Sequence, residues 1–359
     1  MRIVIIGASG NAGTALLRNL QGQLLKRPGS LQLAGVSRRL PDTTLPPYQG
    51  VEWHTMDVGR DADFPLLRSA MAGADAVVHL AWLLQPNRDL ATLRRTNVTG
   101  TANVLEAARQ AGVGHIVCAS SVGAYSKAPK NQRTDESWPA TGIPSSHYSR
   151  HKAEQEALLD RFQAEQPGVK VARLRPGLIF QADAGSEVGQ FFLGPILSRL
   201  VPRRPWLPLL PAPDDLIFQA VHAEDVAEAY WRVLDRGESG AFNVAAKPVI
   251  TPQELARFLR ARRILPIPMS LLRALVDVTW KLRLQPTDAG WIDMAAGAPI
   301  MDTSRARRVL DWEPRRSSMD ALAQILHGMG AGEGVPPSPA LKPRRNLAAA
   351  SRSGHPQVR

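Results

Sequence analysis

Short apolar runs alternate with longer amphipathic segments along the first half of the chain. The apolar runs are rich in Val, Ile and Leu, which is typical of buried β-strands, and the segments between them have the length of helices. The expected strands are 2–6, 31–36, 51–55, 76–80, 115–119 and 169–174, and the expected helices are 11–25, 63–71, 90–110 and 146–166. Strands separated by helices need crossover connections, so the pattern predicts an α/β fold with a doubly wound parallel sheet.

This regularity fades after Pro176, and six prolines fall between residues 195 and 213. We therefore expect a first domain over 1–176 and a smaller substrate-binding region over 177–329, with elements that return to the sheet. The expected elements of this region are a strand at 241–244 and helices at 223–234, 252–262, 269–282 and 319–329. From 330 to 359 the chain has too little apolar surface to offset ordering entropy, which predicts a disordered tail.

The composition narrows the class of protein. Of the 359 residues, 44% are hydrophobic, enough for a large core. The N-terminal apolar run is too short and too weakly charged for a secretion signal, and charged residues or prolines interrupt the other apolar stretches. We therefore expect a cytoplasmic protein with no membrane partner. The single cysteine, Cys118, lies in an apolar run, so neither a disulfide nor a metal site is expected.

The net charge of +12 changes this picture little. The basic residues are scattered along the chain rather than clustered, which argues against nucleic acid as a partner. Small anionic ligands fit the charge better.

The first strand runs directly into a turn and a helix with the sequence IVIIGASGNAG. Gly7 permits a tight turn, Gly10 lets the backbone approach a diphosphate, and Gly13 lets the helix pack on the strand. The helix N-terminus adds free N–H groups and partial positive charge. A turn without a ligand is the alternative, but the position after the first strand favours dinucleotide binding. The turn residues expected to contact the cofactor are Gly7, Ser9, Gly10, Asn11, Ala12 and Gly13.

The end of the second strand indicates which dinucleotide binds. An acidic residue here would hold the ribose hydroxyls of NAD, whereas this chain has Ser37, Arg38 and Arg39. A hydroxyl and two guanidinium groups match the 2′-phosphate of NADP, so NADP is favoured over NAD. The alternative is that both arginines are simply solvated. Asp57 and Val58 follow the third strand, where the carboxylate could accept from the adenine amino group or cap a helix.

Tyr148 and Lys152 lie four residues apart in a predicted helix and so share one face. A tyrosine can transfer a proton while nicotinamide transfers a hydride, provided that its pKa, ordinarily near 10, approaches neutrality. That shift needs about 4 kcal/mol, which a nearby ammonium and a nicotinamide cation could supply. Ser120 and Ser121 end the fifth strand, at the edge where a doubly wound sheet binds ligands, and a serine there can bind the substrate oxygen.

A serine, tyrosine and lysine in this order, behind an N-terminal GxxGxxG turn, resemble the short-chain dehydrogenase/reductase superfamily. The chain length and glycine spacing are similar to its extended branch, the NAD-dependent epimerase/dehydratase family. The resemblance covers about residues 1–315 and implies a Rossmann domain. Further matching stretches are HLAW (79–82), TNVTGTANVLEAA (96–108), LRPGLIF (174–180) and AVHAEDVAEA (220–229).

The resemblance implies a catalytic role for Ser121, Tyr148 and Lys152. Ser121 would orient the substrate oxygen, Tyr148 would be the acid/base, and Lys152 would modulate it while holding the nicotinamide ribose, so that both helix residues also contact the cofactor. Asn97 would support the active site or the cofactor loop, unless it only bonds its own backbone.

Other positions carry weaker expectations. Leu80, Ala81 and Trp82 would line the adenosine and ribose side, and Pro176 would pack beside the nicotinamide or serve only the conformation of the chain. His222 and Asp225 lie in a stretch that closes the substrate region, where a single histidine is more often structural.

The sequence departs from the family pattern at positions that are expected to contact the substrate. Gly177 stands where nucleotide-sugar epimerases usually carry an asparagine that contacts the substrate diphosphate. The apolar segment 191–211 suits a hydrophobic ketone, aldehyde or alcohol, or it builds the core of the smaller region. Arg199, Arg203 and Arg204 keep an anionic substrate possible.

The sequence thus predicts an NAD(P)-dependent oxidoreductase or epimerase that moves hydride between nicotinamide and a carbonyl or secondary alcohol carbon. The alternatives are a nucleotide-sugar 4-epimerase or dehydratase and, in another class, a non-catalytic protein that senses NADP. The resemblance also implies a homodimer in which helices 90–110 and 146–166 form a four-helix interface.

Overall fold

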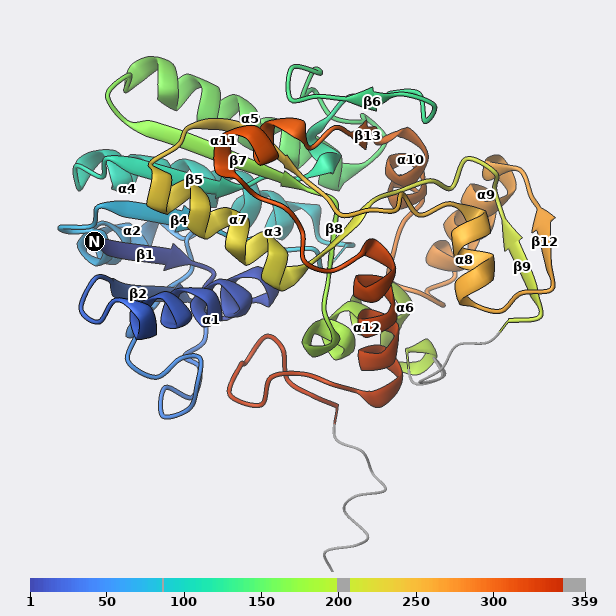
Figure 1. Cartoon of the computed structure of the whole chain (residues 1–359), viewed down its shortest axis with the longest axis horizontal. Coiled ribbons are helices and arrows are strands. Elements are labelled where there is room, and N and C mark those ends of the chain that lie inside the picture. Colours follow the sequence, from blue (N-terminus) through green and yellow to red (C-terminus); the bar gives the residue numbers. More distant parts are fainter. Residues whose placement is uncertain (86, 199–206, 345–359) are drawn as a thin grey trace, which may run out of the picture.

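A seven-stranded parallel sheet forms the centre of the protein (Figure 1). The computed structural model describes residues 1–85, 87–198 and 207–344. The strand order is β11-β7-β5-β4-β1-β2-β3, which confirms the predicted doubly wound parallel sheet. The strands are β1 (Arg2–Ile6), β2 (Gln32–Ser37), β3 (Glu52–Thr55), β4 (Ala76–His79), β5 (His115–Ala119), β7 (Lys170–Pro176) and β11 (Gly240–Val244).

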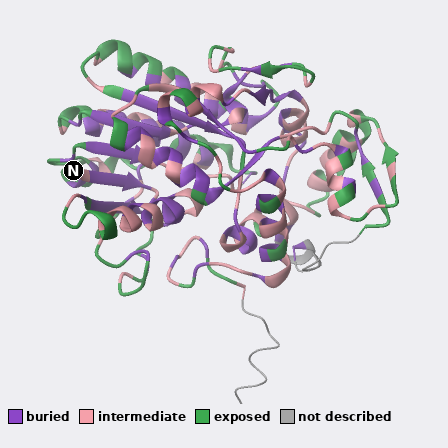
Figure 2. Cartoon of the chain, viewed as in Figure 1, coloured by how far each residue is buried: buried purple, intermediate pink, exposed green. Residues whose placement is uncertain are grey.

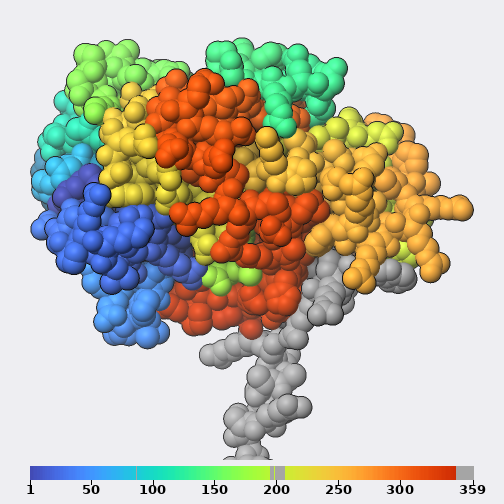
Figure 3. All heavy atoms as spheres, in the orientation of Figure 1, coloured from blue at the N-terminus to red at the C-terminus, as the bar shows by residue number. Residues whose placement is uncertain are grey.

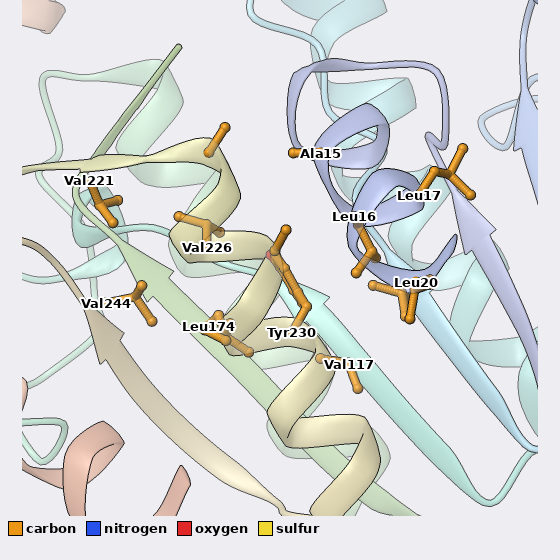
Figure 4. Packing of buried hydrophobic residues seen from close by; sticks show 14 of the residues in the cluster. Ala15, Leu16, Leu17, Leu20, Val117, Leu174, Val221, Val226, Tyr230 and Val244 are labelled. Atoms are coloured by element: carbon orange, nitrogen blue, oxygen red, sulfur yellow. The ribbon is translucent and has the colours of Figure 1, made fainter. Parts of the chain in front are cut away.

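Helices cover both faces of this sheet because its strands are apolar on both sides. In β1, Ile3 and Ile5 join one core with α1 (Asn11–Lys26) and α7 (Ala223–Arg236), part of which Figure 4 shows. The alternate residues of β1 join a second core, which lies under α2 (Phe64–Ala70), α4 (Gly100–Gln110) and α5 (His147–Glu165). Period-two alternation thus buries both faces of a single strand.

The helix expected over 90–110 is not uniform. It consists of α3 (Leu90–Arg94), a π-helical segment (Arg95–Thr99) and α4. A π-helical turn inside a helix re-aims the side chains that it carries and is common at functional sites. Asn97 lies in this segment.

Loops gather at the carboxyl edge of the sheet. The chain proceeds from β1 to β2 and β3 on one side and to β4, β5, β7 and β11 on the other. The strand order reverses between β1 and β4, and ligands of such sheets bind outside the carboxyl ends of the strands at this position.

The smaller region lies beyond this edge and is more exposed than the sheet (Figure 2). Two short parallel pairs belong to it, β8 with β10 and β9 with β12. Its strands are β8 (Leu178–Phe180), β9 (Leu209–Ala212), β10 (Ala220–His222) and β12 (Arg263–Pro266), and its helices are α6 (Gly185–Leu197), α8 (Pro252–Phe258), α9 (Met269–Lys281) and α10 (Gly290–Gly297). A short pair, β6 (Arg133–Thr134) with β13 (Ile300–Met301), and helices α11 (Ser304–Leu310) and α12 (Ser318–Ala331) complete the fold. Within the three described ranges, no helix is long and apolar enough to cross a membrane.

The sequence predicts a disordered tail over 330–359, and this prediction is wrong for residues 330–344. Residues 330–344 pack against the N-terminal region, as the red and blue spheres in Figure 3 show, and Val335 and Leu341 are buried in the core that contains α1. The buried hydroxyl of Ser338 donates to the Ser9 carbonyl oxygen at 2.8 Å. The composition of this segment did not reveal that two apolar side chains and one hydroxyl would hold it against the protein. Residues 345–359 lie outside the described part of the chain.

Replacing Leu341 tests this packing. Leu341 is fully buried, so Leu341→Ala is expected to lower the free energy of unfolding by about 2–5 kcal/mol through lost burial and a residual cavity. Chemical denaturation measures the change. Leu25→Ala is the matched control because Leu25 is 86% exposed. Equal, small effects of both substitutions would contradict the packing of residues 330–344.

Candidate functional site

The glycine-rich turn after β1 has two glycines that the fold requires and one that it does not. Gly7 has a φ of +88°, and a Cβ there would lie 2.7 Å from the Ala81 nitrogen. A Cβ on Gly13 would lie 2.4 Å from the Gly7 oxygen. A Cβ on Gly10 would lie 3.5 Å from its nearest neighbour, the Gly7 oxygen, which is an ordinary contact. Packing within the protein therefore does not explain this glycine.

The N-terminus of α1 fits an anion. Gly10 is the N-cap residue, and α1 has no side-chain cap among the described residues. The first backbone N–H groups and the positive end of the helix dipole are thus available to a phosphate. An open glycine beside an uncapped helix of this length fits the diphosphate of a dinucleotide. Ser9, Asn11 and Ala12 complete the turn, and Gln181 donates to the Asn11 Oδ1 at 2.6 Å.

The residues expected at the adenosine end follow β2 and β3, which are neighbouring strands. The Ser37 hydroxyl donates to the Arg39 carbonyl oxygen at 2.8 Å and so shapes the turn, while Arg38 and Arg39 are exposed. Asp57 accepts from the Gly59 N–H at 3.0 Å and caps its own turn, whose buried Val58 follows it. A phosphate beside the turn after β2 would therefore meet two solvent-facing guanidinium groups.

Ser121, Tyr148 and Lys152 come together at the carboxyl end of β5. Ser121 precedes a short 3-10 helix (Val122–Ala124), while the other two lie on α5. The Ser149 hydroxyl donates to the Gly123 carbonyl oxygen and ties these elements together. A Cβ on Gly123 would lie 2.8 Å from the Tyr148 ring, so the glycine gives the phenol its place.

Burial governs the pKa of Tyr148 in the protein without a nicotinamide. It raises the pKa to about 12, and the neighbouring Ser121 hydroxyl lowers it by less. Tyr148 therefore carries its proton at neutral pH and is a proton donor in this state. The expectation that a bound nicotinamide brings this pKa close to neutrality stays a prediction.

Lys152 faces an aromatic ring rather than the phenol. Its Nζ donates to the Ala119 carbonyl oxygen at 2.7 Å and to the Gln155 Oε1 at 3.0 Å. The same Nζ lies 3.4 Å from the centre of the Trp82 ring, a cation–π contact. Burial lowers the pKa of Lys152 to about 7.

Trp82 also packs edge-on against Tyr148, with 5.9 Å between ring centres. Its side chain thus lies beside Tyr148 and Lys152. The expected contact of Leu80, Ala81 and Trp82 with the adenosine and ribose side of the cofactor stays a prediction. The loop after β4 turns the indole toward α5. Ala81 lies against Gly7 beside the turn, and the Leu80 N–H donates to the Ile6 carbonyl oxygen at 2.8 Å.

Asn97 holds the loop after β4. Its Oδ1 accepts from the Leu83 N–H at 2.7 Å, and its Nδ2 donates to the Leu83 carbonyl oxygen at 2.9 Å. The amide is buried and bonds a distant loop rather than its own backbone. Asn97 is therefore a positioning residue for the loop that carries Trp82.

Pro176 ends β7, and Gly177 has a structural explanation. A Cβ on Gly177 would lie 2.5 Å from the Gln219 carbonyl oxygen, so the neighbouring chain requires glycine here. His222 caps α7 by accepting from the Glu224 N–H at 3.2 Å. Asp225 accepts from the backbone N–H groups of residues 315 and 316. His222 and Asp225 therefore both stabilise the fold.

Sequence reasoning missed Trp291 and did not connect Phe192 with Tyr148. Trp291 of α10 lies 5.0 Å from Tyr148 between ring centres, and Phe192 of α6 lies edge-on to Trp291 at 5.0 Å. Neither spacing nor motif links these positions to Tyr148. Phe192 belongs to the apolar segment expected to cover the substrate, whereas Arg199, Arg203 and Arg204 lie outside the described residues.

A buried ionic network behind the site was also missed. Glu156 accepts from the Arg175 Nε at 2.8 Å, the Arg173 Nη1 at 3.0 Å and the Ser120 hydroxyl at 2.5 Å. Burial by itself raises the pKa of Glu156, but the two arginines lower it to about 2. The signal in the sequence was a glutamate one turn after Lys152. The network joins α5 to β5 and β7.

Other candidate chemistry is not supported by a site. Burial raises the pKa of the Cys118 thiol to about 12, so this thiol is inert. Within residues 1–85, 87–198 and 207–344, no group of His, Cys, Asp and Glu side chains could hold a metal ion.

Comparisons with known proteins place these features in context. A family model described as the NAD dependent epimerase/dehydratase family matches residues 3–245. An uncharacterised protein of Mycobacterium tuberculosis is 27% identical over 325 residues, which are 90% of this chain and 29% of that protein. The chain thus spans less than a third of that relative's length.

Two further proteins are similar over nearly their whole length. The 4-hydroxy-2-methyl-3-oxo-4-farnesyl-3,4-dihydroquinoline-1-oxide ketoreductase of Stigmatella aurantiaca is 25% identical, covering 94% of this chain and 99% of that protein. The dTDP-glucose 4,6-dehydratase of Streptomyces venezuelae, solved with NAD bound, has a TM-score of 0.67 and 21% identity, covering 91% of this chain and 96% of that one. The second likeness shows a shared fold.

Proposed function

The chain belongs to the NAD-dependent epimerase/dehydratase family of extended short-chain dehydrogenases/reductases, and we propose that it reduces or oxidises an apolar carbonyl or secondary alcohol compound. The protein is an NAD(P)-dependent enzyme of this family. One observation carries the proposed reaction: the Ser121 hydroxyl lies close enough to Tyr148 to lower the pKa of the phenol, and Lys152 lies on the same face of α5 as Tyr148. A protein that only sensed NADP would have no need of this proton-transfer group.

Each of these residues has a defined part in the proposed reaction. A bound nicotinamide would supply or accept the hydride at the carbonyl carbon. Tyr148 holds a proton at neutral pH and donates it to the carbonyl oxygen, which the Ser121 hydroxyl also binds. Lys152 lies one turn further along α5, and its positive charge favours the phenolate that remains after proton transfer. The residues that would hold the diphosphate are those of the turn from Gly7 to Gly13.

The proposed substrate class rests on the surroundings of Tyr148. Trp82 and Trp291 pack on the Tyr148 ring, and Phe192 packs on Trp291. Such an aromatic wall favours a substrate with a hydrophobic body. The similar ketoreductase is named for a farnesylated quinoline substrate, in which the farnesyl group is a hydrocarbon chain. Gly177 lacks the side-chain amide that nucleotide-sugar enzymes use, which further favours an apolar compound.

A parallel substrate panel tests this proposal. The purified enzyme is mixed with NADPH or NADH and with apolar ketones, or with nucleotide sugars, and cofactor absorbance and product are followed. Turnover of apolar ketones supports the proposal. Turnover of nucleotide sugars alone would assign the epimerase or dehydratase reaction. Cofactor binding without any turnover would indicate the sensor.

Replacing Trp291 is expected to separate the substrate classes. Trp291→Ala removes the ring that packs on Tyr148, so kcat/KM for an apolar ring ketone should fall about 10- to 100-fold through lost burial. The kcat/KM for a small polar ketone should change much less. Steady-state kinetics on both substrates measures the difference, and a similar loss for both would contradict a role in substrate selection.

The preference for NADP is also proposed and depends on Arg38 and Arg39. Both guanidinium groups are exposed beside the turn after β2, so the variant Arg38→Ser/Arg39→Ser should raise the NADP dissociation constant about 10- to 100-fold. The NAD dissociation constant is the internal control and should change less than about threefold. Calorimetric titration measures both. Unchanged NADP affinity would leave the arginines as solvated surface groups.

The four-helix dimer stays a prediction. Its faces would belong to the helices at 90–110 and 146–166.

A further inference from the structure

Helix α9 has apolar side chains on two different faces. Leu272, Val276 and Trp280 are partly buried, and the Arg88 guanidinium lies 4.4 Å from the centre of the Trp280 ring, so this face is turned toward the protein. Four other aliphatic residues follow one another at intervals of four, three and four positions and so form a second stripe. These residues, which we call the outer face of α9, are Leu271 (56% exposed), Leu275 (59%), Val278 (52%) and Leu282 (64%).

A helix of a water-soluble protein normally has polar residues on its solvent side. No residue of α9 is buried, although most of its side chains are apolar. The helix lies in a lobe with α8, β9 and β12, away from the central sheet (Figure 1). A contiguous exposed stripe of this kind marks a surface that contacts another molecule or a membrane.

The charge of the lobe favours an anionic partner. Residues 252–286 include seven basic and two acidic residues. Three of the basic residues have carboxylate partners, Arg257 with Glu254, Arg273 with Asp293 and Lys281 with Asp277. The other four are exposed and have no ion pair with any residue that the structure describes. They are Arg260, Arg262, Arg263 and Arg283.

This charge disfavours a second copy of the chain as the partner. A two-fold interface would bring the outer face of α9 against itself, and the unpaired arginines of the two copies would repel each other. The outer face also lacks tyrosine and tryptophan, which dominate the binding energy of most protein interfaces. An aliphatic helix face in a lobe with unpaired arginines fits a helix that lies in the interface of an anionic bilayer.

We propose that the outer face of α9 attaches the protein to the surface of a membrane that contains anionic lipid. The leucines enter the boundary between headgroups and acyl chains, and the unpaired arginines contact lipid phosphates. This is attachment without crossing, and it replaces the expectation that the protein has no membrane partner. α9 contacts α10, which carries Trp291, so the attached helix adjoins the wall of the candidate site. The proposal does not depend on the identity of the substrate.

Vesicle co-sedimentation of the full chain tests this attachment. The bound fraction is compared between vesicles of phosphatidylcholine and vesicles that also contain phosphatidylglycerol, at low and high salt. We expect partitioning at least about tenfold stronger onto the anionic vesicles, and weaker binding at high salt. Leu271→Ser/Leu275→Ser should lower partitioning at least about tenfold, and Arg262→Gln/Arg263→Gln should remove much of its salt dependence.

The matched control is Leu25→Ser/Leu66→Ser, which changes two exposed leucines outside the lobe (86% and 55% exposed). All variants should keep the melting temperature and the cofactor affinity of the parent, since the changed side chains are exposed. Absence of binding to anionic vesicles would overturn the proposal, as would an equal loss in the control. A dimer in light scattering that Leu271→Ser/Leu275→Ser converts to a monomer, without vesicle binding, would assign the face to a second copy. Binding to an acidic protein but not to lipid would overturn it as well.

Discussion

Tyr148→Phe is expected to lower kcat by a factor of about 100 or more while the dissociation constant of NADP stays nearly unchanged. The substitution removes one hydroxyl, the group that neighbours Ser121 and holds the transferable proton. The ring remains and still packs on Trp82 and Trp291, so the shape of the site is kept. Steady-state kinetics on the best ketone of the panel and calorimetric titration with NADP measure the two quantities.

Tyr230→Phe is the matched control for this experiment. Tyr230 is fully buried on α7, and its hydroxyl has no hydrogen-bond partner among the described residues (Figure 4). Its loss should therefore leave turnover unchanged and affect stability little. Equal turnover of Tyr148→Phe and the parent enzyme would remove Tyr148 from the mechanism. A large loss of NADP affinity in Tyr148→Phe would instead indicate a cofactor-binding role.

Glu156→Gln is expected to have the largest effect on stability. The side chain keeps its shape but loses its charge, which leaves the buried Arg175 without a counter-charge and Arg173 with only Asp160, at 2.6 Å. Breaking one partner of a buried ion pair costs about 3–5 kcal/mol. Chemical denaturation at neutral pH measures the loss. A change below about 1 kcal/mol would contradict the buried network.

The same network gives a pH dependence with a definite sign. The pKa of Glu156 is lowered to about 2 in the folded protein, whereas the group titrates near 4.5 in an unfolded chain. Its contribution is therefore complete above pH 4.5 and is lost as the pH falls toward 2. Unfolding curves between these pH values should show a larger loss of stability in the parent protein than in Glu156→Gln, which keeps the other carboxylates.

Glu106→Gln is the matched control for the network. Glu106 also pairs with an arginine, Arg109, at 2.6 Å, and its pKa is likewise lowered to about 2 by hydrogen bonds with Arg109 and Gln110. Both members of this pair are exposed on α4, where water screens the charges, so the expected loss is below about 1 kcal/mol. The contrast isolates the effect of burial.

Local patterns in the sequence determined the sheet and much of the candidate site. Apolar alternation in strands such as 2–6 reports burial on two faces, and this is a property of neighbouring residues. The four-residue spacing of Tyr148 and Lys152 places them on one helix face wherever that helix packs. The glycine spacing from Gly7 to Gly13 similarly describes a single turn. These features were predictable because sequence neighbours alone create them.

Only the tertiary structure decided how these pieces act on one another. The indole of Trp82 lies against Lys152, and Trp291 reaches Tyr148 from a distant helix. Desolvation by the assembled site, which no spacing reveals, raises the pKa of Tyr148 to about 12. The burial of Leu341 likewise depends on where the C-terminal segment meets the N-terminal region. Contacts between distant segments and the loss of water around a charge exist only after packing, so the chain's sequence determines the parts of the site and its folding determines their chemistry.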